Sequence, residues 1–78
     1  MDAKLKEAIE LSEMEKYSQA IKLLEKIIKK EPNNEQALFE CGFAYLNLDE
    51  DNKGIEYLQK LLQINPDYPG ARDWHART

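Results

Sequence analysis

The chain has 78 residues, of which 42% are hydrophobic and 33% charged, and its formal net charge is −4. This length allows one domain, and the hydrophobic fraction is too high for a disordered chain. The acidic balance argues against a nucleic-acid-binding protein, which normally carries a basic face, and no apolar run reaches the roughly 18 residues of a membrane span. One cysteine and one histidine exclude an internal disulfide and a Cys/His metal cluster.

The first predicted helix covers residues 2–14, where apolar side chains recur at helical spacing. A polar turn at Glu15-Lys16 leads to a second predicted helix over 17–31. Two lysines lie in the last turn of that helix, where cations suit the helix dipole, and Pro32 then ends it.

A third helix is predicted over 34–48 and a fourth over 51–65, with an acidic turn between them. Either Asn33 or Asn34 suits the N-cap of the third helix. A fifth, short helix is predicted near 69–77. No segment alternates apolar and polar residues with period two, so the predicted fold class is all-α.

The sequence repeats itself with a period of 34 residues, since Pro32 and Pro66 are 34 positions apart. The same shift aligns small and apolar residues without a gap: Ala3 with Ala37, Ala8 with Gly42, Ala20 with Gly54, Ile21 with Ile55 and Leu24 with Leu58. The prediction is a single domain over 1–78, with one copy in 1–34 and a second in 35–68. Residues 69–78 are either a capping helix or the start of a third copy.

The second copy also carries a recognisable motif. It places Leu38, Gly42, Tyr45, Gly54, Leu58 and Pro66 at the spacing of the pattern W-x2-L-G-x2-Y…A-x3-F…P. The chain therefore resembles the tetratricopeptide repeat family. Lys4 and Glu7 depart from the pattern, because they occupy positions that are normally apolar. The resemblance implies a right-handed α-solenoid of antiparallel helix hairpins that binds proteins and is not an enzyme.

The resemblance also implies where a partner would bind, because the first helix of each repeat lines the concave groove in this family. The groove positions correspond to Leu5, Ile9, Glu13, Gln36, Phe39, Phe43, Leu46 and Asn47. Five of them are apolar and surplus to the hairpin core, so they are expected to form a strip in which Phe39 and Phe43 are mostly exposed. Three alternatives are open for what covers this strip. A partner covers it, the chain's own C-terminal helix covers it through Trp74, or a second copy of the chain covers it.

Some family members clamp the C-terminal carboxylates of heat-shock chaperones with lysine, asparagine and arginine side chains. The corresponding positions here hold none of these residues: they are Leu5, Ile9, Glu40, Gly70 and Trp74. That function is therefore not expected of this chain.

Candidate catalytic and ligand-binding residues are scarce. Cys41 falls on a core face beside Gly42, which favours a buried apolar role over a nucleophile. His75 is expected on the surface, and the acidic run 49–52 lacks the length and glycine of a calcium loop. Lysines on the second helix are expected to form a solvated face: Lys22, Lys26, Lys29 and Lys30. We predict no catalytic residue, cofactor or metal.

The function expected from the sequence is a protein-interaction module that holds a peptide or helix in an apolar groove, as a scaffold or adaptor. One alternative is a small inhibitory partner of the antitoxin or immunity type. Another is an N-terminal structural fragment of a longer solenoid. The charged start of the chain, without the apolar stretch of a signal peptide, and the lack of disulfides favour the cytoplasm.

Overall fold

The structure is a computed structural model that describes residues 3–71. Its helices are α1 (Ala3–Glu13), α2 (Tyr17–Lys30), α3 (Glu35–Asn47) and α4 (Asp51–Ile64). The described residues contain no β-strand, so the all-α prediction is confirmed, and the predicted helix ends agree to within one residue. The fifth helix predicted near 69–77 lies mostly outside the described residues, and 69–71 form a turn.

The helix ends follow from particular residues. Helix α3 begins after Asn34, whose side-chain oxygen accepts a hydrogen bond from the backbone N–H of Ala37 at 3.0 Å. This bond satisfies a donor that the first helical turn leaves without a partner. Helices α2 and α4 end shortly before Pro32 and Pro66, because proline lacks an N–H group and disfavours the helical conformation of the residue before it.

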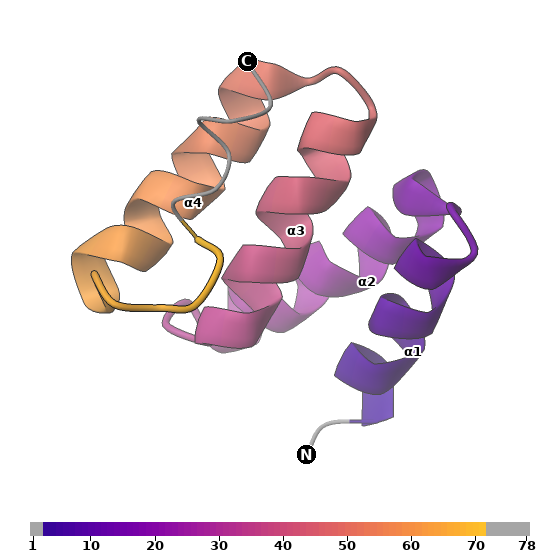
Figure 1. Cartoon of the computed structure of the whole chain (residues 1–78). Helices are drawn as coiled ribbons and strands as arrows, with labels where there is room; N and C mark the ends of the chain where they lie inside the picture. The colour runs from indigo at the N-terminus through magenta and orange to yellow at the C-terminus, as the bar shows by residue number, and fades with distance from the viewer. Residues whose placement is uncertain (1–2, 72–78) are drawn as a thin grey trace.

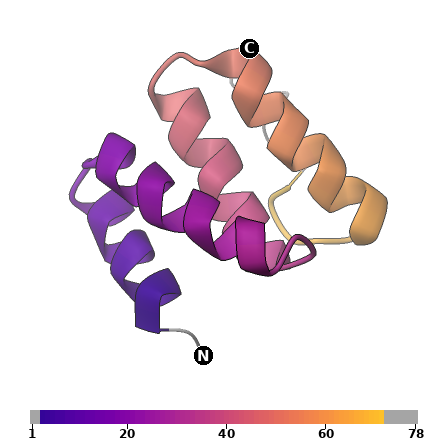
Figure 2. The same cartoon turned by 180° about the vertical axis from the view of Figure 1, so that it is seen from behind.

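The helices pack as two antiparallel hairpins, α1 with α2 and α3 with α4 (Figure 1). Helix α2 packs against α3 and joins the hairpins, and it crosses α3 when the molecule is seen from behind (Figure 2). Helix α1 also contacts α3, so the first helices of the two hairpins are neighbours. Packing of each hairpin on the next in this way is the arrangement of a helical-repeat protein.

Two glycines allow the close approach of α3 and α4. A Cβ atom added to Gly54 would lie 2.7 Å from the backbone oxygen of Gly42, and one added to Gly42 would lie 2.7 Å from Cγ of Leu58. These two glycines therefore face each other across the hairpin. In the other hairpin, Ala8 and Ala20 are both fully buried in the same core cluster.

The buried side chains form two clusters. The larger one joins α1, α2 and α3 and contains Leu5, Ala8, Ala20, Ile21, Leu24, Ile27, Ala37, Cys41, Ala44 and Tyr45. The smaller one contains Leu38, Leu61 and Ala71, and Phe39 and Tyr68 pack against it. The segment after α4 is thus held against α3, toward which it turns back in Figure 1.

The two hairpin turns share one backbone geometry. Glu15 and Asp49, 34 positions apart, both adopt a left-handed conformation, with φ of 62° and 63°. Each turn is closed by a backbone hydrogen bond to the carbonyl five residues earlier, from Lys16 at 2.8 Å and from Glu50 at 2.9 Å. The chain reverses at these turns, so Met14, expected on an apolar helix face, lies beyond the end of α1 and is 57% exposed.

Candidate partner-binding surface

The predicted apolar strip is divided in the structure. Leu5 and Leu46 are only 4% and 5% exposed and belong to the interior, so their assignment to an open groove was wrong. Leu46 is buried because Gly54 has no side chain: a Cβ atom on that glycine would lie 3.0 Å from Cγ of Leu46. Leu5 is part of the larger core cluster. These two residues are therefore not available to a partner.

Phe39 and Phe43 are partly buried, and the expectation that they are mostly exposed was also wrong. Their rings lie 4.9 Å apart between centroids, at 55° to each other, and the ring of Phe39 lies 5.2 Å from that of Tyr68. Such tilted aromatic pairs bury ring surface, and each pair stabilises the fold by about 0.5–1.5 kcal/mol beyond the gain from the buried apolar area. The three rings form an aromatic cluster, which we define as Phe39, Phe43 and Tyr68.

The two phenylalanines differ in what supports them. Phe39 packs against the smaller core cluster, whereas Phe43 belongs to neither core cluster of the described residues and contacts the ring of Phe39. The side-chain amide of Asn47 donates a 2.9 Å hydrogen bond to the backbone oxygen of Phe43, one turn earlier on α3.

The other predicted groove residues lie on α1 and α3. Ile9 is partly buried and packs on the larger core cluster, and Gln36 is partly buried. Glu13 and Asn47 are exposed. The part of the predicted strip that a partner can reach is therefore smaller and more polar than the sequence indicated.

Acidic groups surround the aromatic cluster. Burial raises the pKa of the Glu40 carboxyl above its ordinary value, and the negative charge of Glu13 raises it further. The pKa of the Tyr68 phenol is raised first by burial and then by the charges of Glu40 and Glu35. Glu35 accepts a 2.9 Å hydrogen bond from the side chain of Asn65. Tyr68 of the aromatic cluster is therefore acted on by the negative charges of two carboxylates, Glu35 and Glu40.

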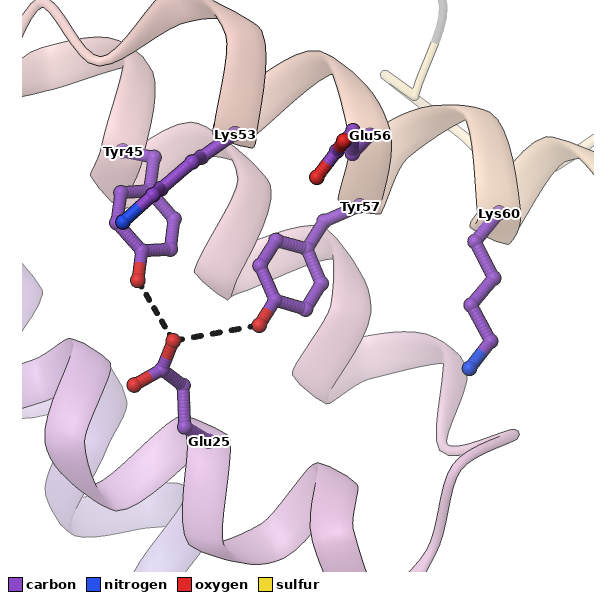
Figure 3. A pocket seen from close by; sticks show the side chains of 6 residues that line it. All are labelled: Glu25, Tyr45, Lys53, Glu56, Tyr57 and Lys60. Atoms are coloured by element: carbon purple, nitrogen blue, oxygen red, sulfur yellow. Dashed lines mark hydrogen bonds between the residues drawn. The ribbon is translucent and has the colours of Figure 1, made fainter.

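A second feature was not predicted from the sequence. The Glu25 carboxylate on α2 accepts hydrogen bonds from the phenols of Tyr45 on α3, at 2.6 Å, and Tyr57 on α4, at 3.3 Å. The two rings are stacked, with centroids 5.7 Å apart and planes at 8°. We call this group, Glu25, Tyr45 and Tyr57, the tyrosine clamp. Figure 3 shows both phenols directed at one oxygen of Glu25.

A pocket of about 320 Å³ adjoins the tyrosine clamp and is also lined by Lys53, Glu56 and Lys60. The ammonium of Lys53 lies 5.7 Å from the centre of the Tyr45 ring, within range of a cation–π interaction. One carboxylate oxygen of Glu25 and the ring of Tyr45 thus already have partners within the chain. The hydrogen bonds of the residues that line the pocket join α2, α3 and α4.

Cys41 lies beside the clamp and is completely buried. Burial raises the pKa of its thiol to about 12, and the charge of Glu25 acts in the same direction. A thiol with so high a pKa carries little thiolate near neutral pH, so Cys41 is unsuited to nucleophilic chemistry.

The lysines expected on a solvated helix face are exposed, as predicted: Lys22, Lys26, Lys29 and Lys30. Within residues 3–71, no three His, Cys, Asp or Glu side chains come close enough together to hold a metal ion. Among the helices of the same residues, none is both long and apolar enough to cross a membrane.

Comparison with known proteins agrees with the helical hairpins. The comparisons with curated proteins and with solved structures give no match. A family model described as tetratricopeptide repeat matches residues 11–77, which is most of the chain. This family consists of non-catalytic modules that generally mediate interactions between proteins. With its all-helical fold and this match, the chain belongs to the tetratricopeptide repeat family.

Proposed function

We propose that this chain is a scaffold or adaptor module that binds a peptide or helix on the face formed by α1 and α3. The observation that carries the proposal is Phe43, a large aromatic side chain that is partly exposed, contacts the ring of Phe39 and, among residues 3–71, lies outside both core clusters. Leaving apolar ring surface in water brings no gain in stability, and such surface commonly marks a binding site.

The proposed binding surface consists of the reachable residues on that face. It comprises Ile9, Glu13, Gln36, Phe39, Phe43 and Asn47. Leu5 and Leu46 are excluded because they are buried. The proposal includes two repeats, in 1–34 and 35–68, which stack to place α1 beside α3. It also includes a cytoplasmic location, since the single cysteine is free and buried.

The test is a pull-down from the source cell with the full chain as bait, followed by mass spectrometry. The comparison is between the unchanged chain and Phe43→Glu, which places a charge on the proposed surface. Gln63→Glu adds the same charge at an exposed position of α4 and serves as the matched control. We expect a set of captured proteins that Phe43→Glu loses and Gln63→Glu retains. Equal capture by all three baits would refute a role for this face.

A further inference from the structure

Charge is divided between the first and second helices of the hairpins. Helix α1 has two lysines and three glutamates and α3 has two glutamates and no cation, which gives a net charge of −3. Helix α2 has four lysines and one glutamate, and α4 has two lysines, one aspartate and one glutamate, which gives +3. Helices α1 and α3 taken together are therefore acidic, whereas α2 is basic and α4 has no net charge.

The acidic side chains are next to the aromatic cluster. Glu40 follows Phe39 directly on α3, is partly buried and feels the charge of Glu13 on α1. Both Glu40 and Glu35 act on Tyr68, whose ring packs at a tilt against that of Phe39. An incoming partner that contacts the rings must consequently come close to at least one partly desolvated carboxylate.

This arrangement discriminates between partners. A purely apolar partner would remove water from Glu40 without replacing it, and an acidic partner would add repulsion, so both lose affinity. A lysine or arginine placed beside the carboxylates would replace the lost water contacts with charge-assisted hydrogen bonds.

We propose that the partner of this face is a cationic amphipathic segment, which sets apolar side chains against Phe39 and Phe43 and lysine or arginine side chains against Glu13 and Glu40. This inference rests on the function proposed above and names the chemistry of its ligand. The occupant is a segment of another protein.

The probe is a phage-displayed library of random 16-residue peptides, selected on the full chain without any choice of sequence beforehand. The enriched peptides are synthesised, and their affinities are measured by fluorescence anisotropy at two salt concentrations. We expect enriched peptides with net positive charge and apolar residues at helical spacing, whose binding weakens as the salt concentration rises.

Three variants separate the outcomes. Phe43→Ala tests the proposed function, and we expect it to abolish binding. Glu13→Gln with Glu40→Gln tests the charge, and we expect affinity to fall by roughly tenfold, as two partly screened charge pairs would give. The control, Glu31→Gln with Glu56→Gln, makes the same change in net charge at exposed positions elsewhere and should alter affinity less than twofold.

Enriched peptides that need Phe43 but are neutral or acidic would overturn the inference and leave the proposed function standing. Enriched peptides that bind Phe43→Ala equally well, or a selection without enrichment, would overturn both. If the control pair lowers affinity as much as Glu13→Gln with Glu40→Gln, the attraction is a property of net charge and the inference fails.

Analytical ultracentrifugation of the chain alone tests a further outcome. A dimer that Phe43→Ala dissociates would show that a second copy of the chain occupies this face, and it would overturn the inference.

Loss of binding must also be distinguished from loss of fold. Because burial and Glu13 both raise the pKa of Glu40, the ionised form of this carboxyl is disfavoured in the folded chain. We therefore expect Glu40→Gln to melt at the same or a higher temperature while it binds more weakly. A lower melting temperature together with weaker binding would show that Glu40 supports the fold and is not held for a partner.

Discussion

The phenol of Tyr45 donates a hydrogen bond of 2.6 Å to the carboxylate of Glu25, twenty residues earlier in the chain. This bond joins the second helix of one hairpin to the first helix of the next. Tyr57 reaches the same oxygen from α4 at 3.3 Å, so one carboxylate connects three helices. In a domain this small, a polar contact across the hairpin junction is a substantial part of the net stability.

Tyr45→Phe should lower the free energy of unfolding by about 1 kcal/mol, because it removes a hydrogen bond from a nearly buried phenol to a carboxylate. Tyr57→Phe is the matched comparison, since its bond is longer and more exposed, and it should cost less. Urea denaturation followed by circular dichroism gives both values. Equal losses for the two variants, or a larger loss for Tyr57→Phe, would contradict the geometry of the clamp.

Stability should fall at alkaline pH because of the same residues. Burial raises the pKa of both phenols, Tyr45 and Tyr57, above the ordinary value of about 10. Above that pH the unfolded chain loses these protons while the folded chain keeps them, so the free energy of unfolding decreases as pH rises. The Cys41 thiol, whose pKa is also raised in the folded chain, lowers the free energy of unfolding in the same way from about pH 8.5 upward. Urea denaturation midpoints measured between pH 8 and 11 give the slope of stability against pH. Tyr45→Phe should reduce this slope.

Cys41 should react with a thiol reagent such as DTNB only when the chain unfolds. The side chain is inaccessible and its pKa is raised to about 12, so thiolate is scarce and access is blocked. Labelling at pH 8 should be slow in buffer and fast in urea. In a Cys41→Ala background, Gln63→Cys places a thiol at an exposed site of α4 and should react at once. Rapid labelling of native Cys41 would mean that α3 opens locally.

Gly54→Ala should destabilise the chain although alanine favours helices by about 1 kcal/mol over glycine. The added Cβ would lie 2.7 Å from a backbone oxygen of α3, and overpacking of this kind typically costs about 1–3 kcal/mol. Gly42→Ala should also destabilise the chain, because its Cβ would lie 2.7 Å from Cγ of the fully buried Leu58 and 3.1 Å from the backbone oxygen of Gly54. Thermal melts compare the two variants. A stabilised Gly54→Ala would show that α3 and α4 can separate freely.

The two phenylalanines should respond differently to truncation. Phe39→Ala removes packing against the smaller core cluster and Tyr68, and we expect a loss of about 2–4 kcal/mol. Phe43→Ala removes one ring contact, and we expect a loss of about 1 kcal/mol. Urea denaturation measures both. If Phe43→Ala unfolds the chain, Phe43 belongs to the core, and the argument that it is held for a partner fails.

The helices could be predicted closely from the sequence because their ends depend on local chemistry. Proline, asparagine caps and apolar spacing act within a few residues, and the 34-residue period fixed which small residues meet. The shift of 34 positions aligns the small residues Ala8 with Gly42 and Ala20 with Gly54, and the structure brings Gly42 and Gly54 together. Information of this kind is contained in short stretches of sequence.

The binding surface was predicted less well because it depends on contacts between distant residues. Nothing near Leu46 in the sequence indicates that Gly54 leaves space for its side chain, or that Tyr68 turns back onto Phe39. The tyrosine clamp was missed for the same reason. The one available signal was general: a buried tyrosine needs a hydrogen-bond partner for its hydroxyl, and Tyr45 lies on a core face.

The opposite charges of the first and second helices also bear on how fast a partner arrives. The charges within the helices, −3 on α1 and α3 together, +3 on α2 and no net charge on α4, contribute an electric dipole to the fold. In dilute salt this field would turn an approaching cation-bearing chain toward Phe43 before any side chain touches. Association would slow as ions screen the dipole over about 10 Å at 0.1 M. Dissociation would depend on ring contacts of shorter range and would change little.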